Sequence, residues 1–498
     1  MINHSSQKIF NNSLLYSIGM IFSKAVGFFL VPIYTYFVST QEYGIATTIT
    51  TFVSTFGIVI TLSLRAAMIR FYNQYGEQER KVFVGTILSF VMLNALGICT
   101  LLCVFKNLYA RFLFEGIDFY PLVFLGVLSL GFEGIYIIYQ SLLQAKQDGK
   151  SYSVNSVIYL LFHAATVVLF VAIFRMGAVG IVLSNLVTNI GFAIYGVISM
   201  YRRGYMTFAW DKTMLKESLK YSIPILPHNL ATNLNTYSTK TIINNFLGYA
   251  LSGIYELASQ FSTIFALVQS SVNLAFRSWF VEQMQSGEEG KKQIKYMTCM
   301  IMSLFAFCAL GISLFSKELV LILSERSYAD AWKMIPFFIL TQLVAFIYFS
   351  HVQTLMYNLK KSKYTFICSS SSVVVNIIVA LCLVEYLGIY AILIAHFVSQ
   401  TIMALLAVIM GRRAEKVDFG LPRMLLFIGQ SVLLMGAGML VDFAFGISIK
   451  FWAVFAKILI LGIGVMFFIY PYKNDFGELI LGLLKKRKKE DENDGEKV

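Results

Sequence analysis

The sequence is poor in charged residues, proline and tryptophan. Charged residues make up 13% of the 498 residues, and the chain has 7 prolines and 4 tryptophans. Hydrophobic residues make up 57%, and the mean hydropathy is +0.70. This composition excludes a water-soluble globular domain and is typical of an all-α, polytopic membrane protein.

The sequence also lacks the motifs of common enzymes and ATP-driven pumps. It has neither a GxxxxGK[ST] loop nor an HExxH motif, and no polar segment is long enough for an ATPase domain. We therefore expect no enzyme activity, no cofactor, and transport that is downhill or coupled to H⁺ or Na⁺. Cysteine is scarce and lies only in apolar runs, which predicts neither a disulfide nor a metal site. The cysteines are Cys99, Cys103, Cys299, Cys308, Cys368 and Cys382.

Fourteen apolar segments are long enough to cross a bilayer. The polar residues 1–12 contain no cleavage site, so the first span is predicted to be retained. The predicted spans are 13–38, 44–69, 82–105, 119–144, 152–174, 178–200, 221–246, 251–276, 296–316, 334–358, 364–386, 388–411, 424–446 and 451–471.

Lysine and arginine are distributed unevenly between the two sides of these spans. With residue 1 on the cytoplasmic side, cytoplasmic segments hold 29 of the 40 Lys and Arg residues and external loops hold 7. Because cytoplasmic loops carry the positive excess, both termini are predicted to be cytoplasmic, and the net charge of +13 implies no nucleic-acid partner. The run KKRKK at 485–489 is predicted to be a solvated anchor or a contact for lipid headgroups.

The chain repeats weakly at an offset of about 210 residues. Gly44 aligns with Gly253, and Gly177 with Gly388. Because each half has an even number of spans, the halves share one orientation, and we expect substrate to bind between them. The predicted parts are two pseudo-symmetric six-helix lobes at 1–204 and 205–420, an extra helix pair at 421–472, and a basic and acidic tail at 473–498.

Polar side chains form stripes at helical spacing on three predicted spans. Because a polar face is tolerated at membrane depth only beside protein or water, we expect a hydrated cavity between the first, second, seventh and eighth spans. An alternative is that these groups bond neighbouring turns and helices. The stripe residues are Thr47, Thr51, Ser54, Thr61 and Arg65; Asn229, Asn233, Thr236 and Lys240; and Glu256, Gln260, Thr263 and Ser270, with Arg277 one turn further.

Basic residues dominate this predicted cavity: Lys24, Arg65, Lys240 and Arg277. Guanidinium and ammonium groups attract phosphate oxygens, so these four are the predicted substrate-binding residues. An ion pair is the alternative for two of them, Lys24 with Glu133 and Lys240 with Glu256.

Two carboxylates within spans, Glu133 and Glu256, are the candidates for ion coupling. The apolar sequence around Glu133 suits a group that takes up and releases a proton. His163 is a candidate proton relay to Glu133, whereas His228, His351 and His396 are expected to be hydrogen-bonded core or interface residues.

Two stretches carry a family resemblance, FFLVPIYTYFVSTQEYGI at 28–45 and RAAMIRFY at 65–72, together with the duplicated halves. The chain resembles the lipid-linked oligosaccharide flippases, the polysaccharide transporter branch of the multidrug, oligosaccharidyl-lipid and polysaccharide exporter superfamily. The resemblance implies a flippase of the bacterial cytoplasmic membrane that moves an undecaprenyl-diphosphate-linked sugar unit to the outer leaflet for O-antigen, capsule or exopolysaccharide synthesis. It also implies a cationic cavity, and a polymerase and glycosyltransferases as partners. By similarity to lipid II flippases, we expect the last two spans to border an apolar groove.

Three alternatives are left open. A cation-coupled multidrug exporter of the same fold usually carries a carboxylate in its first helix, where this chain has Lys24 and no Asp or Glu. A lipid II flippase is the second alternative. The third, a scaffold that recruits a polymerase or glycosyltransferase, does not need the polar stripes.

Overall fold

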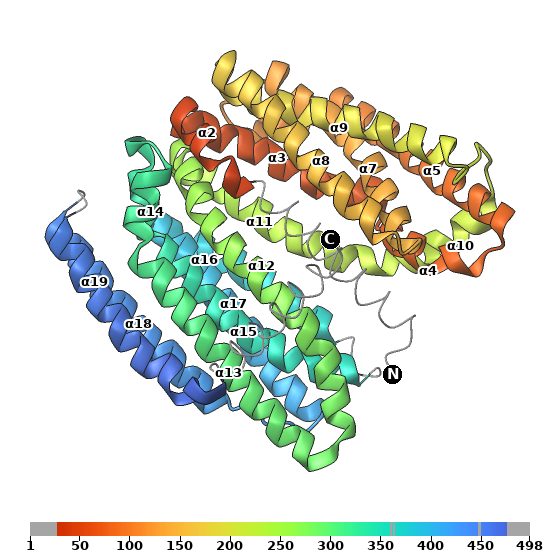
Figure 1. Ribbon diagram of the computed structural model, residues 1–498. Helices are drawn as coiled ribbons and strands as arrows, with labels where there is room; N and C mark the ends of the chain where they lie inside the picture. The colour runs from red at the N-terminus through yellow and green to blue at the C-terminus, as the bar shows by residue number, and fades with distance from the viewer. Residues whose placement is uncertain (1–26, 359–360, 362–363, 447–449, 476–498) are drawn as a thin grey trace, which may run out of the picture. The chain divides into compact units, whose positions relative to one another are not determined.

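The computed structural model describes residues 27–358, 361, 364–446 and 450–475. Within these ranges the regular structure is helical and contains no strand, which confirms the all-α prediction (Figure 1). The long helices are α3 (Thr40–Thr61), α5 (Glu77–Val104), α7 (Phe124–Ala145), α8 (Gly149–Val167), α9 (Gly177–Arg202), α11 (Leu226–Leu247), α12 (Tyr249–Gln285), α13 (Gly287–Leu314), α15 (Ile335–Tyr357), α16 (Tyr364–Leu387), α17 (Ile389–Ala414), α18 (Leu421–Phe445) and α19 (Phe451–Gly464). The shorter helices are α2 (Val31–Phe37), α4 (Leu64–Phe71), α6 (Lys106–Leu113), α10 (Lys212–Ser222) and α14 (Ser316–Leu323).

Twelve helical segments in the described ranges are long and apolar enough to cross a membrane. They correspond to twelve of the fourteen predicted spans. Most of the first predicted span, 13–38, lies outside the described residues, and the seventh forms α11, whose polar residues keep it out of the twelve. A polytopic membrane protein is therefore confirmed, and the count of fourteen stays a prediction.

Several helices begin or end elsewhere than predicted. Helix α12 runs to Gln285 instead of ending at 276, and α13 begins at Gly287. The span predicted at 221–246 divides into α10, a short 3₁₀ turn and α11. Pro227 lies in the first turn of α11, where its missing N–H removes no helical hydrogen bond.

Helix α3 begins at a capping box and ends at a backbone break. Ser39 Oγ accepts a hydrogen bond from the Glu42 N–H at 3.3 Å, and Glu42 Oε2 accepts one from the Ser39 N–H at 3.3 Å. At the other end, Leu62 and Ser63 both adopt the left-handed conformation, with φ of 45° and 57°. Neither residue is glycine, so the break is strained.

This break corrects the prediction of one continuous helix over 44–69. Asn94 of α5 donates hydrogen bonds from Nδ2 to the carbonyl oxygens of Ile60 at 2.7 Å and Val59 at 3.3 Å. These bonds satisfy acceptors that a continuous helix pairs within itself. Arg65 therefore belongs to the next helix, α4, and not to the polar stripe on α3.

Contacts divide the chain into two compact units. Unit 1 comprises Met1–Leu267, Leu323–Ala331 and Phe366–Ile402, and unit 2 comprises Val268–Ile322, Trp332–Thr365 and Met403–Val498. In unit 1, α7 packs against α3, α5 and α9, and α11 packs against α3; in unit 2, α13 packs against α15 and α18. The units group residues differently from the predicted lobes and the extra helix pair, whose bounds stay a prediction.

Two glycines let helices α3 and α12 cross in backbone contact within unit 1. A Cβ on Gly44 would lie 1.9 Å from the Tyr249 carbonyl oxygen, and a Cβ on Gly253 would lie 2.1 Å from the Thr40 carbonyl oxygen. The contacts are reciprocal, because each glycine meets the carbonyl four residues before the other. A self-complementary contact of this kind is what a two-fold relation between the halves predicts.

The second aligned glycine pair shares a backbone conformation. Gly177 and Gly388 have φ of 55° and 54° and lie at the starts of α9 and α17. The left-handed region favours glycine, which explains the residue at both positions. Both glycine pairs agree with the predicted duplication.

Candidate functional site

Three cavities follow α3 through unit 1, and we call them together the α3 tract. Their volumes are about 430 Å³ for the first, 60 Å³ for the second and 350 Å³ for the third. Ser54 lines all three cavities, and Glu133 lines the second and third. The predicted residues that line the tract are Thr51, Ser54, Thr61, Arg65, Glu133, Asn229, Asn233, Thr236, Lys240, Glu256 and Gln260.

A buried ion pair between Lys240 of α11 and Glu256 of α12 lines the first cavity. Lys240 Nζ lies 2.6 Å from Glu256 Oε2 and donates a hydrogen bond to the Thr47 carbonyl oxygen at 3.1 Å. Gln260 Nε2 donates to Glu256 Oε1 at 2.7 Å. Of the two roles left open for Lys240, the ion pair is the one that the structure contains.

Glu133 of α7 lies opposite Gly57 of α3, where the second and third cavities meet. Its Oε2 atom is buried and has no hydrogen-bond partner among the described residues. A Cβ on Gly57 would lie 3.3 Å from this oxygen, so the glycine leaves the space beside it open. A buried carboxylate oxygen without a partner is costly, which favours a proton, cation or water at this point. The alternative partner, Lys24, lies outside the described residues.

Arg65, near the start of α4, lines the third cavity with an exposed side chain. Its Nη2 donates to Gln144 Oε1 at 3.1 Å. In the same cavity Asn229 Nδ2 donates to Ser63 Oγ at 3.1 Å. Arginine has five N–H donors in a planar fork, so this guanidinium retains donors for an anionic ligand.

The hydroxyl groups of the tract bond within their own helix. Thr51, Ser54 and Thr61 each donate to the carbonyl oxygen four residues earlier, at 2.7, 3.0 and 3.0 Å. This bonding agrees with the alternative interpretation, in which the polar groups bond neighbouring turns. Each hydroxyl oxygen can nevertheless still accept a hydrogen bond from a ligand in the cavity. Local bonding and cavity lining are therefore compatible for these residues.

Four predicted site residues are not placed in the tract. Lys24 lies outside the described residues. Thr263 donates to the Ser259 carbonyl oxygen at 3.1 Å. Ser270 and Arg277 belong to unit 2, where Arg277 Nη2 lies 3.1 Å from Met356 Sδ. The boundary between the units falls inside α12, so its polar stripe does not line a single cavity of unit 1.

Sequence reasoning missed an aromatic and amide portion of the tract. Asn189 Oδ1 accepts a hydrogen bond from the Tyr159 hydroxyl at 3.1 Å, and Asn189 Nδ2 donates to Ser129 Oγ at 2.9 Å. The spacing of Asn185 and Asn189 by four residues was an available signal for a polar helix face. The missed lining residues include Tyr34, Tyr43, Tyr159, Asn185 and Asn189.

His163 also lines the first cavity, but its hydrogen-bond contact differs from the predicted one. Nδ1 lies 3.3 Å from Thr188 Oγ1, and the ring stacks near Tyr159 with centroids 6.3 Å apart. Direct proton relay between His163 and Glu133 therefore has no support from these contacts.

Sequence comparison matches this chain to a described family and to two curated relatives. The family described as "Polysaccharide biosynthesis protein" matches residues 9–280. Lsg locus putative protein 1 of Haemophilus influenzae is 23% identical over 346 residues, which cover 68% of this chain and 82% of the relative. An uncharacterized membrane protein of the same organism is 21% identical over 373 residues, covering 74% of this chain and 88% of the relative.

Structure comparison matches solved transporters. The lipid II flippase MurJ in an inward closed conformation has a TM-score of 0.72 at 16% identity, covering 94% of this chain and 100% of that one. The Vibrio cholerae MATE transporter VcmN in its bent form has a TM-score of 0.54 at 13% identity, covering 84% and 98%. At these identities the likeness shows the fold alone, which is that of MurJ and MATE proteins.

Proposed function

The chain belongs to the polysaccharide biosynthesis protein family, and on that premise we propose that it is a flippase for a lipid-linked oligosaccharide. It moves an undecaprenyl-diphosphate-linked repeating unit from the cytoplasmic to the outer leaflet of the bacterial cytoplasmic membrane by ion-coupled alternating access. The product serves O-antigen, capsule or exopolysaccharide synthesis, with a polymerase and glycosyltransferases as partners. Both termini are cytoplasmic in this proposal.

The α3 tract is the observation that carries the proposal. Its wall combines tyrosine rings with amides, hydroxyls and charged groups. Sugars bind to such surfaces because their hydroxyls hydrogen-bond to the polar groups while their C–H faces pack on aromatic rings. A site for an apolar drug is lined mostly by hydrophobic side chains instead.

The diphosphate is proposed to contact the basic residues. Arg65 is exposed in the third cavity and donates a hydrogen bond to Gln144, which leaves other guanidinium N–H groups for a ligand, so it is the first candidate. Lys240 bonds Glu256 and the Thr47 carbonyl oxygen, which leaves one of its three N–H donors for a phosphate oxygen when substrate enters the first cavity. Lys24 and Arg277 stay predicted ligands.

Ion coupling is proposed to act through Glu133. Its unpartnered Oε2 lies at the wall shared by two cavities, so a proton or Na⁺ that binds there changes the charge of the tract. Glu256 is the weaker candidate, because Lys240 already neutralises it. Coupling by Glu133 requires no metal cofactor.

A lipid II flippase is the second candidate function, favoured by the fold likeness to MurJ. That substrate also has a polyprenyl diphosphate, so a diphosphate contact by Arg65 does not distinguish the two functions. The two substrates differ in the sugar that they carry, and a comparison of those sugars distinguishes the functions. The described wall of the tract carries two basic residues, Arg65 and Lys240, and two carboxylates, Glu133 and Glu256, so a cationic drug is tested directly rather than excluded by charge.

The test uses purified protein in liposomes that contain one of three fluorescent substrates. These are a polyprenyl-diphosphate oligosaccharide, lipid II and a cationic dye, and the readout is the fraction that reaches the opposite leaflet or compartment. We expect the wild type to flip the oligosaccharide and both Lys24→Gln and Arg65→Gln to lose at least about tenfold in rate. Arg70→Gln, on the same short helix as Arg65, is the matched control.

Faster flipping of lipid II than of the oligosaccharide substrate would support the second candidate function instead. A folded wild type that flips none of the lipid-linked substrates, with or without an ion gradient, would contradict the proposal. Unchanged flipping by both Lys24→Gln and Arg65→Gln would be compatible with the proposed substrate but would refute the proposed phosphate contacts.

A further inference from the structure

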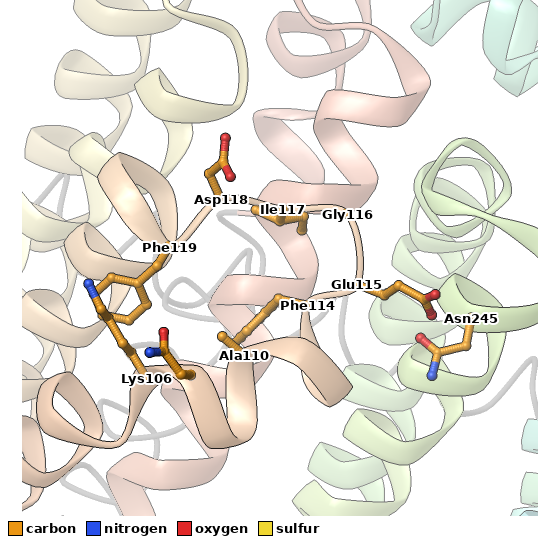
Figure 2. Close-up of a pocket in the computed structure, with 10 residues that line it drawn as sticks. Lys106, Ala110, Phe114, Glu115, Gly116, Ile117, Asp118, Phe119 and Asn245 are labelled. Carbon is orange, nitrogen blue, oxygen red and sulfur yellow. The ribbon is translucent and has the colours of Figure 1, made fainter.

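A further cavity of unit 1 lies outside the α3 tract. It has a volume of about 890 Å³ and opens beside the segment that joins α6 to the start of the next span. Five polar or charged side chains and two aromatic rings, those of Phe114 and Phe119, contribute to its wall (Figure 2). These lining residues include Lys106, Asn107, Glu115, Asp118, Phe119 and Asn245.

Contacts from two other elements hold this cavity in shape. The Tyr249 hydroxyl at the start of α12 donates a hydrogen bond to the Glu115 carbonyl oxygen at 3.0 Å. Lys106 Nζ lies 5.4 Å from the Phe119 ring centroid and 4.6 Å from the Tyr120 ring centroid, within range of a cation–π interaction. The segment is therefore tied to α6, to α12 and to the chain that follows it.

The chemistry of the wall excludes two ligand classes. A bound Ca²⁺ needs six to eight converging oxygens, whereas Figure 2 shows Glu115 directed toward Asn245 and Asp118 directed elsewhere. An apolar ligand gains no hydrogen bond from the carboxylates and amides of the wall, which are exposed to solvent. A ligand rich in hydroxyls satisfies all of them, because each hydroxyl both donates and accepts.

An aromatic cluster connects this cavity to α3, the helix whose other side chains line the α3 tract. Phe114 lines the cavity and packs edge-on against Phe52 of α3, with ring centroids 5.2 Å apart. Phe52 also lies 6.0 Å from the rings of Tyr109 and Tyr237. The Tyr109 hydroxyl is buried and has no hydrogen-bond partner among the described residues.

We propose that this cavity is a saccharide subsite, an outer vestibule that receives the sugar chain as it leaves the α3 tract past the Phe52 cluster. The inference rests on the proposed function and on the predicted topology, which places residues 106–118 outside the cytoplasm. Glu115 and Asn245 bind sugar hydroxyls, and the passing sugar supplies a partner for the Tyr109 hydroxyl. The lipid diphosphate does not enter the vestibule.

The experiment compares two substrates that differ only in sugar length. Full-length protein in liposomes flips a polyprenyl diphosphate that carries one sugar or the first four sugars of the same repeating unit. The variant is Glu115→Gln combined with Asn245→Ala, and the control is Glu385→Gln, an exposed carboxylate near a predicted external loop. We expect the double variant to flip the four-sugar substrate about tenfold more slowly, as two lost hydrogen bonds imply, and the one-sugar substrate at the wild-type rate.

A second measurement reads binding without transport. In the Asn245→Cys variant, an impermeant maleimide labels the exposed position 245, and labelling is followed with each substrate present. The four-sugar substrate is expected to slow labelling and the one-sugar substrate is not.

Each possible outcome either supports or contradicts the proposed vestibule. Equal losses for both substrates, no loss for either, or equal protection by both would overturn the vestibule while the flippase stands. A folded wild type that flips neither substrate overturns the flippase and the vestibule with it.

Discussion

Units 1 and 2 both bury charged side chains, but they do so in different ways. In unit 2, Lys457 Nζ lies 2.7 Å from Glu318 Oε2 and 2.7 Å from Asp442 Oδ1, and Lys317 Nζ lies 3.3 Å from Asp442 Oδ1. Two positive and two negative charges thus balance in a cluster that joins α14, α18 and α19. In unit 1, Glu133 Oε2 has no partner among the described residues.

The difference separates charges that hold the fold from charges that are available to ligands. The cluster in unit 2 is sealed, since its four side chains are at most 11% exposed. The charges of the α3 tract line cavities. Substitutions in the cluster are therefore expected to change the free energy of unfolding, and substitutions in the tract are expected to change transport.

The largest effect is expected from Lys457→Met. This change leaves Glu318 and Asp442 with Lys317 alone, and removing one partner from a buried charge group typically costs about 3–5 kcal/mol. Reversible unfolding in detergent micelles by denaturant measures the loss. Lys291→Met is the matched control, because the Lys291–Glu288 pair has the same 2.7 Å distance but Glu288 is 83% exposed, so its loss should be below about 1 kcal/mol. Equal losses would remove the distinction between sealed and exposed charges.

Gly44→Ala is expected to have the next largest effect. The new Cβ meets the Tyr249 carbonyl oxygen, so α3 and α12 must separate, at a cost of about 1–3 kcal/mol in unfolding free energy. Gly253→Ala breaks the reciprocal contact and should match it. Gly97→Ala in α5 is the control, since a Cβ there meets no atom within 4 Å and alanine favours the helix. Wild-type stability in the two contact variants would refute the backbone crossing.

Glu133→Gln tests the opposite case, a charge whose removal changes transport more than stability. The amide keeps the shape of the carboxyl but takes up no proton, and its neutral carbonyl oxygen holds Na⁺ more weakly than a carboxylate does. We expect the flipping rate under an ion gradient to fall to the rate without one, while unfolding free energy stays within about 1 kcal/mol of wild type. Gly57→Ala crowds the same oxygen and should weaken coupling in the same direction. Gradient dependence that survives both changes would exclude Glu133 as the coupling group.

Apolar runs and charge patterns predicted most of the fold, because bilayer thickness dictates both the length and the composition of a span. The break at Leu62 and Ser63 was not predictable, since neither residue is a helix breaker. It depends on Asn94 of another helix, which accommodates the freed carbonyls. Long-range partners of this kind leave no mark on the local sequence.

Helical spacing predicted the α3 wall of the tract, because one face of a single helix is a local property. It also singled out Lys240 and Glu256, although it did not decide between ligand and ion pair. The tyrosines were missed because the chain has 28 of them, and only packing determines which ones reach a cavity. Thr263 is not among the residues of the three described cavities, since the course of α12 is set by tertiary contacts, and its role stays a prediction.

The smallest effect is expected from Arg65→Lys, which keeps the charge and removes the planar fork. If Arg65 holds the diphosphate by two parallel hydrogen bonds, lysine should raise the half-saturating substrate concentration about threefold and leave the maximal rate unchanged. If Arg65 only attracts the anion by its charge, lysine should match the wild type, and Arg65→Gln alone should weaken binding. Arg70→Lys is the control, because the Arg70 guanidinium lies 4.9 Å from the Tyr221 ring centroid and outside the cavity lining. If Arg65→Lys lowered the unfolding free energy as much as Gly44→Ala does, Arg65 would have a structural role, like the sealed charges of unit 2, and not a role in substrate binding.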